Sequence, residues 1–225
     1  MSMSKLDENF KLVVNVLNKN NIVFWICHGT LLGIIRDKKL IEWDNDVDIA
    51  VWKSNNNKKK IEMLLISNGF KKKKKFFDND NLLTLTRRNG KEVDINFYEK
   101  PYSSKYTYQR HYDFKNFVCR IIYVLSRGKK YNGNYKSIVK LLSPLSIFFK
   151  IIKKKLIEKK LFYNEIGYMT PKIHFNNLCK INFQNLKVYL PYNHKMYLRN
   201  IYGANWKVPK KNYKWTLDSP SSKKI

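Results

Sequence analysis

The sequence contains few cysteines, glycines and prolines. Its three cysteines, Cys27, Cys119 and Cys179, are odd in number and far apart, and none pairs with a histidine at zinc-finger spacing. This arrangement argues against a disulfide scaffold and against a structural zinc site. The chain has eight glycines and six prolines and no internal repeat, which excludes collagen-like, solenoid and low-complexity architectures.

Long apolar runs are also missing. No stretch approaches the roughly 20 apolar residues that a membrane-spanning helix needs. The N-terminal sequence MSMSKLDENFKLVV is polar and acidic where a signal peptide would be apolar. We therefore expect an intracellular, cytoplasmic protein with no signal peptide and no transmembrane helix, which touches a membrane at its periphery at most.

Acidic residues are scarce, with 17 Asp and Glu against 45 Lys and Arg and a formal net charge of +28. A surplus of this size is typical of proteins that bind nucleic acid or an anionic membrane surface. Runs such as Lys71 to Lys75 and Asn55 to Asn57 indicate a coding bias, which explains much of the charge without a ligand. Since 44% of the residues are apolar and 15% aromatic, we expect a folded protein with a sizeable core.

Apolar periodicity in the first hundred residues predicts a mixed α/β sheet. The predicted order is a helix from Leu6 closed by Asn20-Asn21, a strand at 22–27, a helix from the Gly29-Thr30 turn, a strand at 47–52, a helix ending near Gly69, and strands at 82–86 and 92–98.

The character of the chain changes after Pro101. Residues 102–165 are basic and aromatic, with apolar helical stretches at 114–125 and 138–161, the second interrupted by Pro144. From Phe183 the pattern is mixed again, with a strand at 188–190 and a helix at 193–202 closed by Gly203. We therefore expect three parts: a core at 1–100, a helical basic insertion at 101–182, and a C-terminal segment at 183–225 that completes the core.

Four of the 17 acids lie close together, and they are Glu42, Asp44, Asp46 and Asp48. On the predicted strand, Asp46 and Asp48 share one face at a spacing of about 7 Å, so their carboxylates repel unless a cation lies between them. An EF-hand would need Gly and Glu where Ile49 and Asn55 stand. A solvated turn is the other alternative, but the Val-Asp-Ile-Ala-Val context favours a strand.

A third carboxylate belongs to the same pattern. Asp94 lies between β-branched neighbours in Val93-Asp94-Ile95, 46 residues after Asp48. On an adjacent strand, Asp94 would complete a site with Asp46 and Asp48 for one or two Mg²⁺ ions, or Mn²⁺. A single Asp on a strand is more often a surface residue, so this assignment depends on the pair upstream.

A candidate phosphate cradle precedes the acidic cluster. Gly29 allows a close approach of the backbone to a ligand, Thr30 adds a hydroxyl at a helix start, and the guanidinium of Arg36 is suited to a bidentate contact with phosphate. A Gly-Thr pair alone is weak support for such a site. Its position within twenty residues of the acids places the cradle opposite the predicted metal site.

These motifs resemble the LicD/fukutin family of phosphotransferases with a nucleotidyltransferase fold. The resemblance lies in Gly29-Thr30-Leu31-Leu32-Gly33-x-x-Arg36, in Trp43-Asp44-x-Asp46-x-Asp48-Ile49, in Leu190-Pro191 with Tyr197-Leu198, and in Tyr202-Gly203-x-Asn205-Trp206-x-x-Pro209. It covers about residues 20–100 and 183–210. Asn45 and Asn205 depart from acidic residues that are frequent in the family. His28 precedes Gly29-Thr30 at a position where the family varies, so we expect His28 to be a buried structural residue.

The resemblance implies a nucleotidyltransferase-like mixed sheet with a helical, basic insertion. It implies a metal-dependent enzyme that transfers a phospho-alcohol, of the phosphocholine or ribitol phosphate type, from a CDP-linked donor to a sugar hydroxyl of a glycan or lipid-linked glycan. It makes Asp46 and Asp48 ligands of Mg²⁺ or Mn²⁺ and Asp94 a third ligand or a base. It places Gly29, Thr30 and Arg36 near the donor phosphates.

Two alternative functions stay open on the sequence alone. One is nucleotidyl transfer from an NTP to a small molecule or nucleic acid, with diphosphate leaving. The other is a non-catalytic basic protein that binds nucleic acid, whose affinity would fall steeply with salt and would not depend on the aspartates.

The insertion has its own pair of interpretations. Residues 137–162 alternate apolar side chains with lysines, and the longest Lys-free stretch, 141–149, contains Pro144. They form either a helical cap on the core with a solvated lysine face or a peripheral contact with an anionic membrane.

Overall fold

The computed structural model describes residues 6–73 and 81–224. Its contacts divide the chain into two compact units, which we describe separately. The first unit comprises the chain up to His111 together with Gly167–Lys223, and the second comprises Tyr112–Ile166. The division expected from the sequence, into residues 1–100, 101–182 and 183–225, remains our proposal.

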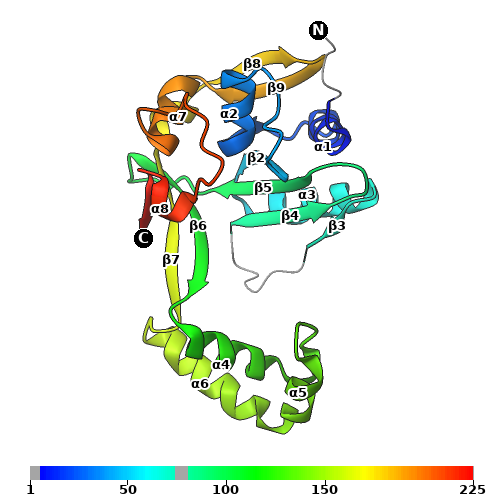
Figure 1. The fold of residues 1–225 in the computed structure, drawn as a ribbon, viewed down its shortest axis with the longest axis vertical. Helices are drawn as coiled ribbons and strands as arrows, with labels where there is room; N and C mark the ends of the chain where they lie inside the picture. The colour runs from blue at the N-terminus through cyan, green and yellow to red at the C-terminus, as the bar shows by residue number, and fades with distance from the viewer. Residues whose placement is uncertain (1–5, 74–80, 225) are drawn as a thin grey trace. The chain divides into compact units, whose positions relative to one another are not determined.

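Helices and strands alternate as far as α3, and the strands β3 to β6 then follow one another (Figure 1). The order there is α1 (Glu8–Lys19), β1 (Phe24–Ile26), α2 (His28–Arg36), β2 (Asp46–Trp52), α3 (Asn55–Ser67), β3 (Lys71–Lys72), β4 (Leu82–Thr86), β5 (Glu92–Tyr98) and β6 (Tyr106–Phe114).

The second half contains more helix. It continues with α4 (Phe117–Arg127), the 3₁₀ turn η1 (Gly128–Lys130), α5 (Lys136–Leu141), η2 (Ser143–Leu145), α6 (Ser146–Glu158), β7 (Tyr163–Pro171), η3 (Lys172–Phe175), β8 (Leu178–Phe183), β9 (Leu186–Pro191), α7 (His194–Tyr202), α8 (Trp215–Asp218) and β10 (Ser222–Lys224).

A five-stranded sheet in the order β1-β2-β5-β4-β3 forms the centre of the first unit. Strands β2 and β5 are parallel, and the other neighbouring pairs are antiparallel. The register places Asp48 beside Asp94, and Asp94 beside Thr84 on β4. The mixed α/β class expected from the sequence is therefore confirmed, and the sheet brings two acidic motifs together that are 46 residues apart.

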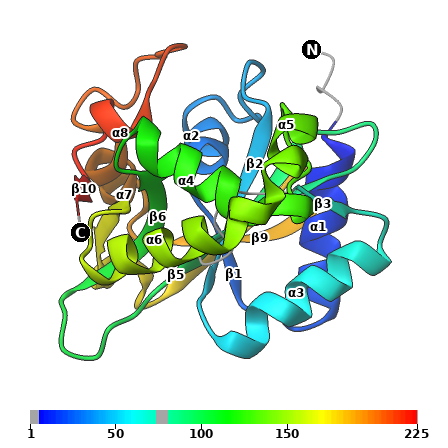
Figure 2. The same cartoon turned by 90° about the horizontal axis from the view of Figure 1, so that it is seen from below.

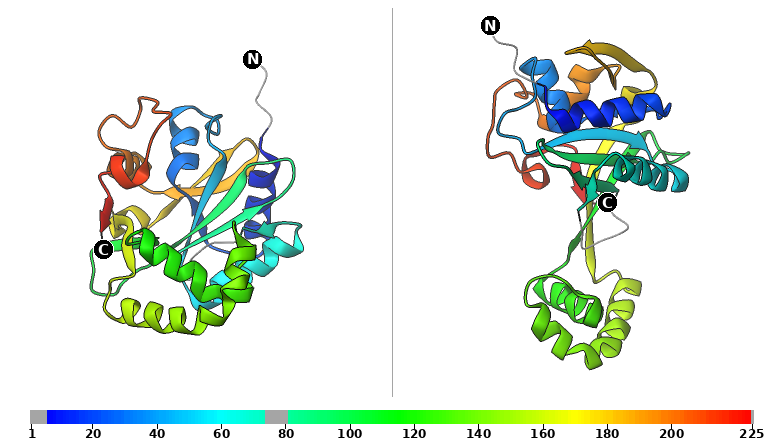
Figure 3. Two further views of the ribbon diagram at one scale, coloured as in Figure 1. Left: turned by 60° about the horizontal axis from the view of Figure 1, so that its bottom comes forward. Right: turned by 90° about the vertical axis from the view of Figure 1, so that its right-hand side faces the viewer.

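Helices α1 and α3 lie side by side against the sheet (Figure 3), where α1 contacts β5, α3 and the hairpin strand β9. Helix α1 begins at Asp7, whose carboxylate accepts hydrogen bonds from the amides of Asn9 and Phe10 at 3.0 and 2.9 Å. Phe10, Val13 and Leu17 recur at helical spacing and are fully buried, so one apolar face fixes the helix on the core.

The second unit is a small helical module in which α4 and α6 pack together (Figure 2). Its buried cluster consists of Cys119, Ile122 and Phe162, with Phe149 and Leu156 of α6 packed against it. Asn116 caps α4 by accepting a hydrogen bond from the Cys119 amide at 2.9 Å. Within residues 6–73 and 81–224, none of the helices has the length and apolar character required to cross a bilayer.

Most elements predicted from periodicity are present, including the strands at 82–86 and 92–98 and the helix ended by Gly203, whose φ is +85°. The sequence did not predict β6, β7 or β8. Strand β6 reads YTYQRHYDF and has no clean apolar alternation, because only Thr107 and Gln109 among its residues are buried. Its polar buried face belongs to the site described next.

Candidate active site

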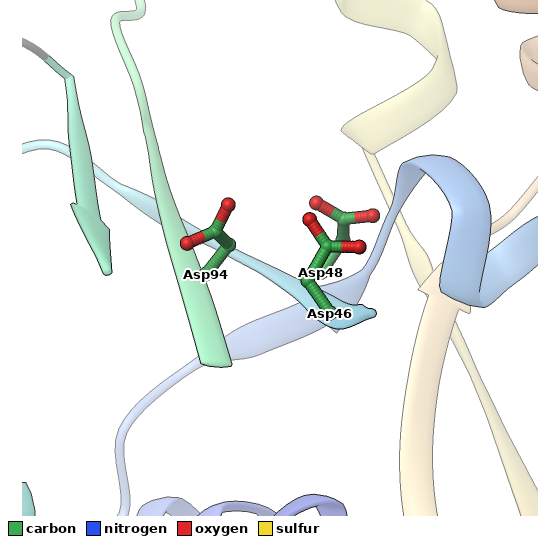
Figure 4. A group of neighbouring side chains, drawn as sticks. All are labelled: Asp46, Asp48 and Asp94. Carbon is green, nitrogen blue, oxygen red and sulfur yellow. The ribbon is translucent and has the colours of Figure 1, made fainter. Parts of the chain in front are cut away.

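Three aspartates from two neighbouring strands converge at one point of the first unit. Asp46 and Asp48 lie on β2 and Asp94 lies on β5, and Figure 4 shows their carboxylates rising from the same face of the sheet. One carboxylate oxygen from each lies within 4.8 Å of the others. All three side chains are half-buried, so the cluster is accessible from the cavity above it.

The alternation of the strands explains this arrangement. Val47 and Ile49 on β2 and Val93 and Ile95 on β5 are buried, while the intervening aspartates take the opposite face. Because β2 and β5 are parallel and in register, Asp48 and Asp94 are direct cross-strand neighbours. A buried apolar layer therefore holds three negative charges close together.

Asp48 is the most tightly held of the three. Its carboxylate accepts hydrogen bonds from the Gly29 amide at 3.1 Å and from Nδ2 of Asn96 at 3.3 Å. Its own backbone amide donates to the hydroxyl of Thr30 at 2.7 Å. Burial and the neighbouring carboxylates nevertheless raise the pKa of Asp48 well above its ordinary value, which indicates uncompensated negative charge.

Asp94 and Asp44 extend the acidic cluster. The hydroxyl of Thr84 donates a short hydrogen bond to Oδ1 of Asp94 across the β4–β5 pair. Burial, the charge of Asp46 and a shared hydrogen bond with that residue raise the pKa of Asp44 to about 7. Lys91 holds the preceding loop by donating to the backbone carbonyls of Ile41, at 3.1 Å, and of Asp44.

Helix α2 starts directly at the cluster. A Cβ on Gly29 would run into the carboxylate of Asp44, so a larger residue here would require the Asp44 side chain to move away from the start of the helix. At Gly33 a Cβ would lie 2.6 Å from the carbonyl oxygen of Lys39, because the helix packs directly against the loop that follows it. Both glycines of the Gly-Thr-Leu-Leu-Gly motif therefore serve close approach.

Arg36 at the end of α2 lines the same cavity. Its Nε and Nη2 donate to Asp37 at 2.8 and 2.7 Å, which uses two of its five N–H donors and fixes the plane of the guanidinium. Thr30, by contrast, is buried at 3% exposure, and its hydroxyl holds the Asp48 amide. The structure thus brings Gly29 and Arg36 to the cavity and places Thr30 beneath it.

A chain of buried polar side chains leads away from Asp48. Asn96 donates to Asp48, Nε2 of Gln109 on β6 donates a short hydrogen bond to Oδ1 of Asn96, and Oε1 of Gln109 lies 2.9 Å from Nε2 of His28. Tyr98 continues the chain at 3.2 Å from His28. Burial lowers the pKa of His28 to about 3, so the ring is neutral and buried, as the sequence led us to expect.

The acids open into a cavity of about 650 Å³ whose other walls come from β6, β7 and the C-terminal segment. Tyr168 and Trp215 pack with ring centroids 5.1 Å apart, and Tyr202 and Tyr213 with centroids 4.9 Å apart. The remaining C-terminal lining residues are Asn205, Trp206, Val208, Pro209, Lys210, Lys211 and Asp218.

Sequence reasoning missed several of these groups. Asn96 was within reach, because it lies two residues after Asp94 on the same strand and therefore on the same face. Gln109 belongs to a strand whose pattern gave no signal, and Trp215 was not singled out at all. The aromatic wall pairs Tyr168 of β7 with Trp215 of α8, and no local sequence pattern predicts a contact between such distant residues.

The donor set fits a hard divalent cation. Mg²⁺ and Mn²⁺ prefer carboxylate oxygens, and three of them converge here within 4.8 Å. The raised pKa of Asp48 points in the same direction, since mutual repulsion is what a bound cation would relieve. Asp44 extends the negative charge but stands at the edge of the cluster.

Comparison with known proteins identifies a family for part of the chain. Residues 21–122 match the family model LicD/FKTN/FKRP, nucleotidyltransferase domain. The chain is 23% identical over 214 residues to human ribitol-5-phosphate transferase FKTN, an alignment that covers 95% of this chain and 36% of that protein. The chain therefore spans about a third of the length of this relative.

Two solved structures show weaker likeness. The lincosamide antibiotic adenylyltransferase LnuA, lincomycin-bound, is 10% identical with a TM-score of 0.44, covering 84% of this chain and 82% of that one. ANT(2")-Ia in complex with adenylyl-2"-tobramycin is 9% identical with a TM-score of 0.34, covering 67% and 96%.

The family model begins before β1 and ends within α4, so it includes the sheet, helix α2 and all three aspartates. Residues 21–122 thus match the LicD/FKTN/FKRP nucleotidyltransferase domain family, and the sheet that they contain has a mixed α/β, nucleotidyltransferase-like fold.

Proposed function

We propose that this protein transfers a phospho-alcohol from a CDP-linked donor to a hydroxyl of a glycan or lipid-linked glycan. The observation that carries the proposal is the meeting of three carboxylates and several cationic side chains, Arg36, Lys210 and Lys211, around one cavity. A diphosphate donor requires both, because a metal held by acids and basic groups nearby share the charge of its phosphates. The cavity volume of about 650 Å³ suits a small nucleotide-linked donor.

In this proposal Asp46, Asp48 and Asp94 hold Mg²⁺ or Mn²⁺, and the bound ion supplies Lewis-acid neutralisation of the diphosphate. Gly29 allows the donor phosphates to approach the start of α2. The hydroxyl of Thr30 positions Asp48 by accepting a hydrogen bond from the Asp48 backbone amide. Arg36, held flat by Asp37, presents its remaining N–H groups to a phosphate. Lys211 lies over the ring of Trp43 at 5.5 Å and brings a second positive charge to the cavity.

The reaction is an in-line displacement at phosphorus. An acceptor hydroxyl oxygen attacks the phosphate that carries the alcohol, the bond to the bridging oxygen breaks, and CMP leaves with the electron pair. The hydroxyl proton passes to a carboxylate oxygen, and Asp94 is the best-placed base if it is not a ligand. Thr84 orients Asp94 for either role by donating to its Oδ1. No side chain is needed as a covalent intermediate.

The family relationship supports the substrate class. The human relative is named for the transfer of ribitol-5-phosphate, and its alignment covers nearly all of this chain. Donors of the ribitol phosphate and phosphocholine types are both compatible with the cavity. The aromatic wall with Trp215 and Tyr168 is suited to stacking on a nucleobase or to packing on the transferred alcohol.

The experiment is a donor panel. The purified protein is incubated with Mg²⁺ or Mn²⁺ and with CDP-ribitol, CDP-choline or each NTP, in the presence of candidate sugar acceptors, and released CMP and diphosphate are measured. We expect CMP from a CDP-alcohol, abolished by chelation and by Asp46→Asn or Asp48→Asn. Asp113→Asn, an exposed position of the second unit, is the matched control.

Three outcomes would overturn the proposal. Release of diphosphate from an NTP, with no CMP from any CDP-alcohol, would assign nucleotidyl transfer to the site instead. Full CMP release by both aspartate variants would remove the acidic cluster from the reaction. Binding of nucleic acid that falls steeply with salt and ignores the aspartate variants would favour a non-catalytic role.

A further inference from the structure

The second unit exposes an unusual number of apolar side chains along one short segment. Between residues 138 and 151, seven large hydrophobic residues are 37% to 79% exposed. They are Ile138, Leu141, Leu142, Leu145, Ile147, Phe148 and Ile151. We call this set the apolar corner.

The apolar corner is compact in space because its elements are consecutive and touch. Helix α5 contacts η2, and η2 contacts the start of α6, with Pro144 inside the 3₁₀ turn between them (Figure 2). Pro144 at this position favours the sharp bend, since its fixed φ suits the start of a helical turn. The bend gathers residues of three short elements into one corner.

These side chains are not needed for the core of the unit. Helix α6 uses Phe149, Ile152 and Leu156, at spacings of three and four residues, to pack against Cys119, Ile122 and Phe162. Ile147 and Ile151 lie on the opposite side of the same helix and are 67% and 52% exposed. Apolar patches of this kind are uncommon on surfaces that only meet water.

Lysines accompany the corner. Residues 112–166 carry 13 Lys and Arg against three acids. Lys154 and Lys155 follow Ile151 by three and four residues, so they flank it on the outer face of α6, where both are exposed. Lysines beside an exposed apolar strip can extend their ammonium groups past it toward an anionic layer.

We propose that the apolar corner is a peripheral docking site for an anionic lipid surface. Apolar side chains enter the boundary between headgroups and acyl chains, and the surrounding lysines pair with the headgroups. A second copy of the chain fits this surface poorly, because it would bring two equally cationic faces together. Nucleic acid would use the lysines and leave the apolar side chains in water.

The experiment is flotation of the full chain with vesicles of phosphatidylcholine, with and without phosphatidylglycerol, at about 0.1 M salt, where charges are screened beyond roughly 10 Å. We expect binding to the anionic vesicles that weakens as salt rises. The combined variant Leu141→Ser, Leu145→Ser, Phe148→Ser should lose more than about tenfold in binding, since it removes three apolar side chains that would enter the lipid. All three positions are exposed, so folding is unaffected by the change, which circular dichroism checks.

A second variant tests the charges, and a third is the control. Changing Lys150, Lys154 and Lys155 together to Gln should weaken binding by roughly fivefold for each lysine and flatten its salt dependence. Met63→Ser with Ile66→Ser on α3 removes two apolar side chains that are 66% and 46% exposed, and this variant should bind as the wild type does.

The proposal fails if the wild type stays unbound to anionic vesicles at low salt, or if the serine variant binds undiminished. It also fails if the wild type is a dimer that the serine variant converts to monomers, since a second copy would then cover the corner. CMP release with soluble substrates should be equal in all of these variants, so this test is independent of the transferase proposal.

Discussion

The replacement of Asp48 by Asn offers the sharpest test of the acidic cluster, because it changes stability in a direction opposite to most buried substitutions. The carboxylate of Asp48 shares a region 4.8 Å across with those of Asp46 and Asp94. At this distance and an effective dielectric constant of about 20, each like-charged pair costs about 3 kcal/mol. Asn keeps the size of the side chain and removes these repulsions.

Part of the gain is offset by weaker hydrogen bonds. Asp48 accepts from the Gly29 amide and from Asn96, and each neutral replacement costs about 0.5–1.5 kcal/mol. With two like-charged pairs removed and two hydrogen bonds weakened, we therefore expect metal-free Asp48→Asn to be more stable than the wild type by about 3–5 kcal/mol. For a chain of this size, that is a rise in Tm of roughly 6–20 °C.

Scanning calorimetry in EDTA measures the stability of the metal-free proteins, and a second scan with Mg²⁺ measures how much the metal stabilises each of them. Mg²⁺ at a hundredfold excess over its Kd should stabilise the wild type by about 2.7 kcal/mol and leave the variant nearly unchanged. Asp113→Asn should behave as the wild type in both buffers. Equal Mg²⁺ shifts in the wild type and in Asp48→Asn would refute the metal-site argument, and so would a metal-free variant less stable than the wild type.

Three further predictions follow from the same geometry. Gly29→Ala should lower CMP release while the protein stays folded by circular dichroism, because its methyl group would displace the Asp44 carboxylate at the edge of the acidic cluster; wild-type activity in Gly29→Ala would contradict the close approach. Arg36→Lys should raise the donor KM severalfold, because an ammonium cannot pair with both oxygens of Asp37 and also hold a phosphate; an unchanged KM would make Arg36 purely structural. Folding raises the pKa of Asp44 from its ordinary value of 3.8 to about 7, so Asp44 favours the folded state at low pH. This stabilisation is lost as the pH rises through 7, and the metal-free Tm should therefore fall between pH 3.8 and about 7. Asp44→Asn should reduce the change of Tm with pH. If Tm rose with pH in the wild type and not in Asp44→Asn, burial and the repulsion from Asp46 would not raise the pKa of Asp44 as we infer.

The sheet and the acidic triad were predictable because local patterns determine them. In β2 and β5 each aspartate alternates with a buried Val or Ile. This alternation alone predicts that Asp46, Asp48 and Asp94 lie on strands, face the same side of the sheet and come together. The helix after β1 was predictable for a similar reason, since Leu31, Leu32, Ile34 and Ile35 follow the Gly29-Thr30 turn at helical spacing.

The rest of the site depends on contacts between distant segments. Gln109 reaches the site from β6, whose buried polar residues hide its strand pattern. The hydroxyl of Thr30, which we expect near the donor phosphates, accepts a hydrogen bond from the Asp48 amide, and no local pattern predicts that contact. Whether Gly29, Arg36 and the three aspartates have the proposed roles stays a prediction that the variants will test. The division of the chain at residues 101 and 183 also stays a proposal.

The polar chain from Asp48 to His28 has a direction, and that direction has a consequence for the histidine ring. A carboxylate only accepts, so Asn96 turns its NH₂ group to Asp48 and its oxygen to Gln109, which in turn presents its own oxygen to His28. The ring must then carry its proton on Nε2, which leaves Nδ1 as a buried acceptor. If Asp48 becomes neutral, both amides are free to reverse and the proton can move to Nδ1. The tautomer of a histidine three hydrogen bonds away therefore records whether Asp48 is charged, and the ¹⁵N chemical shifts of that ring would report it.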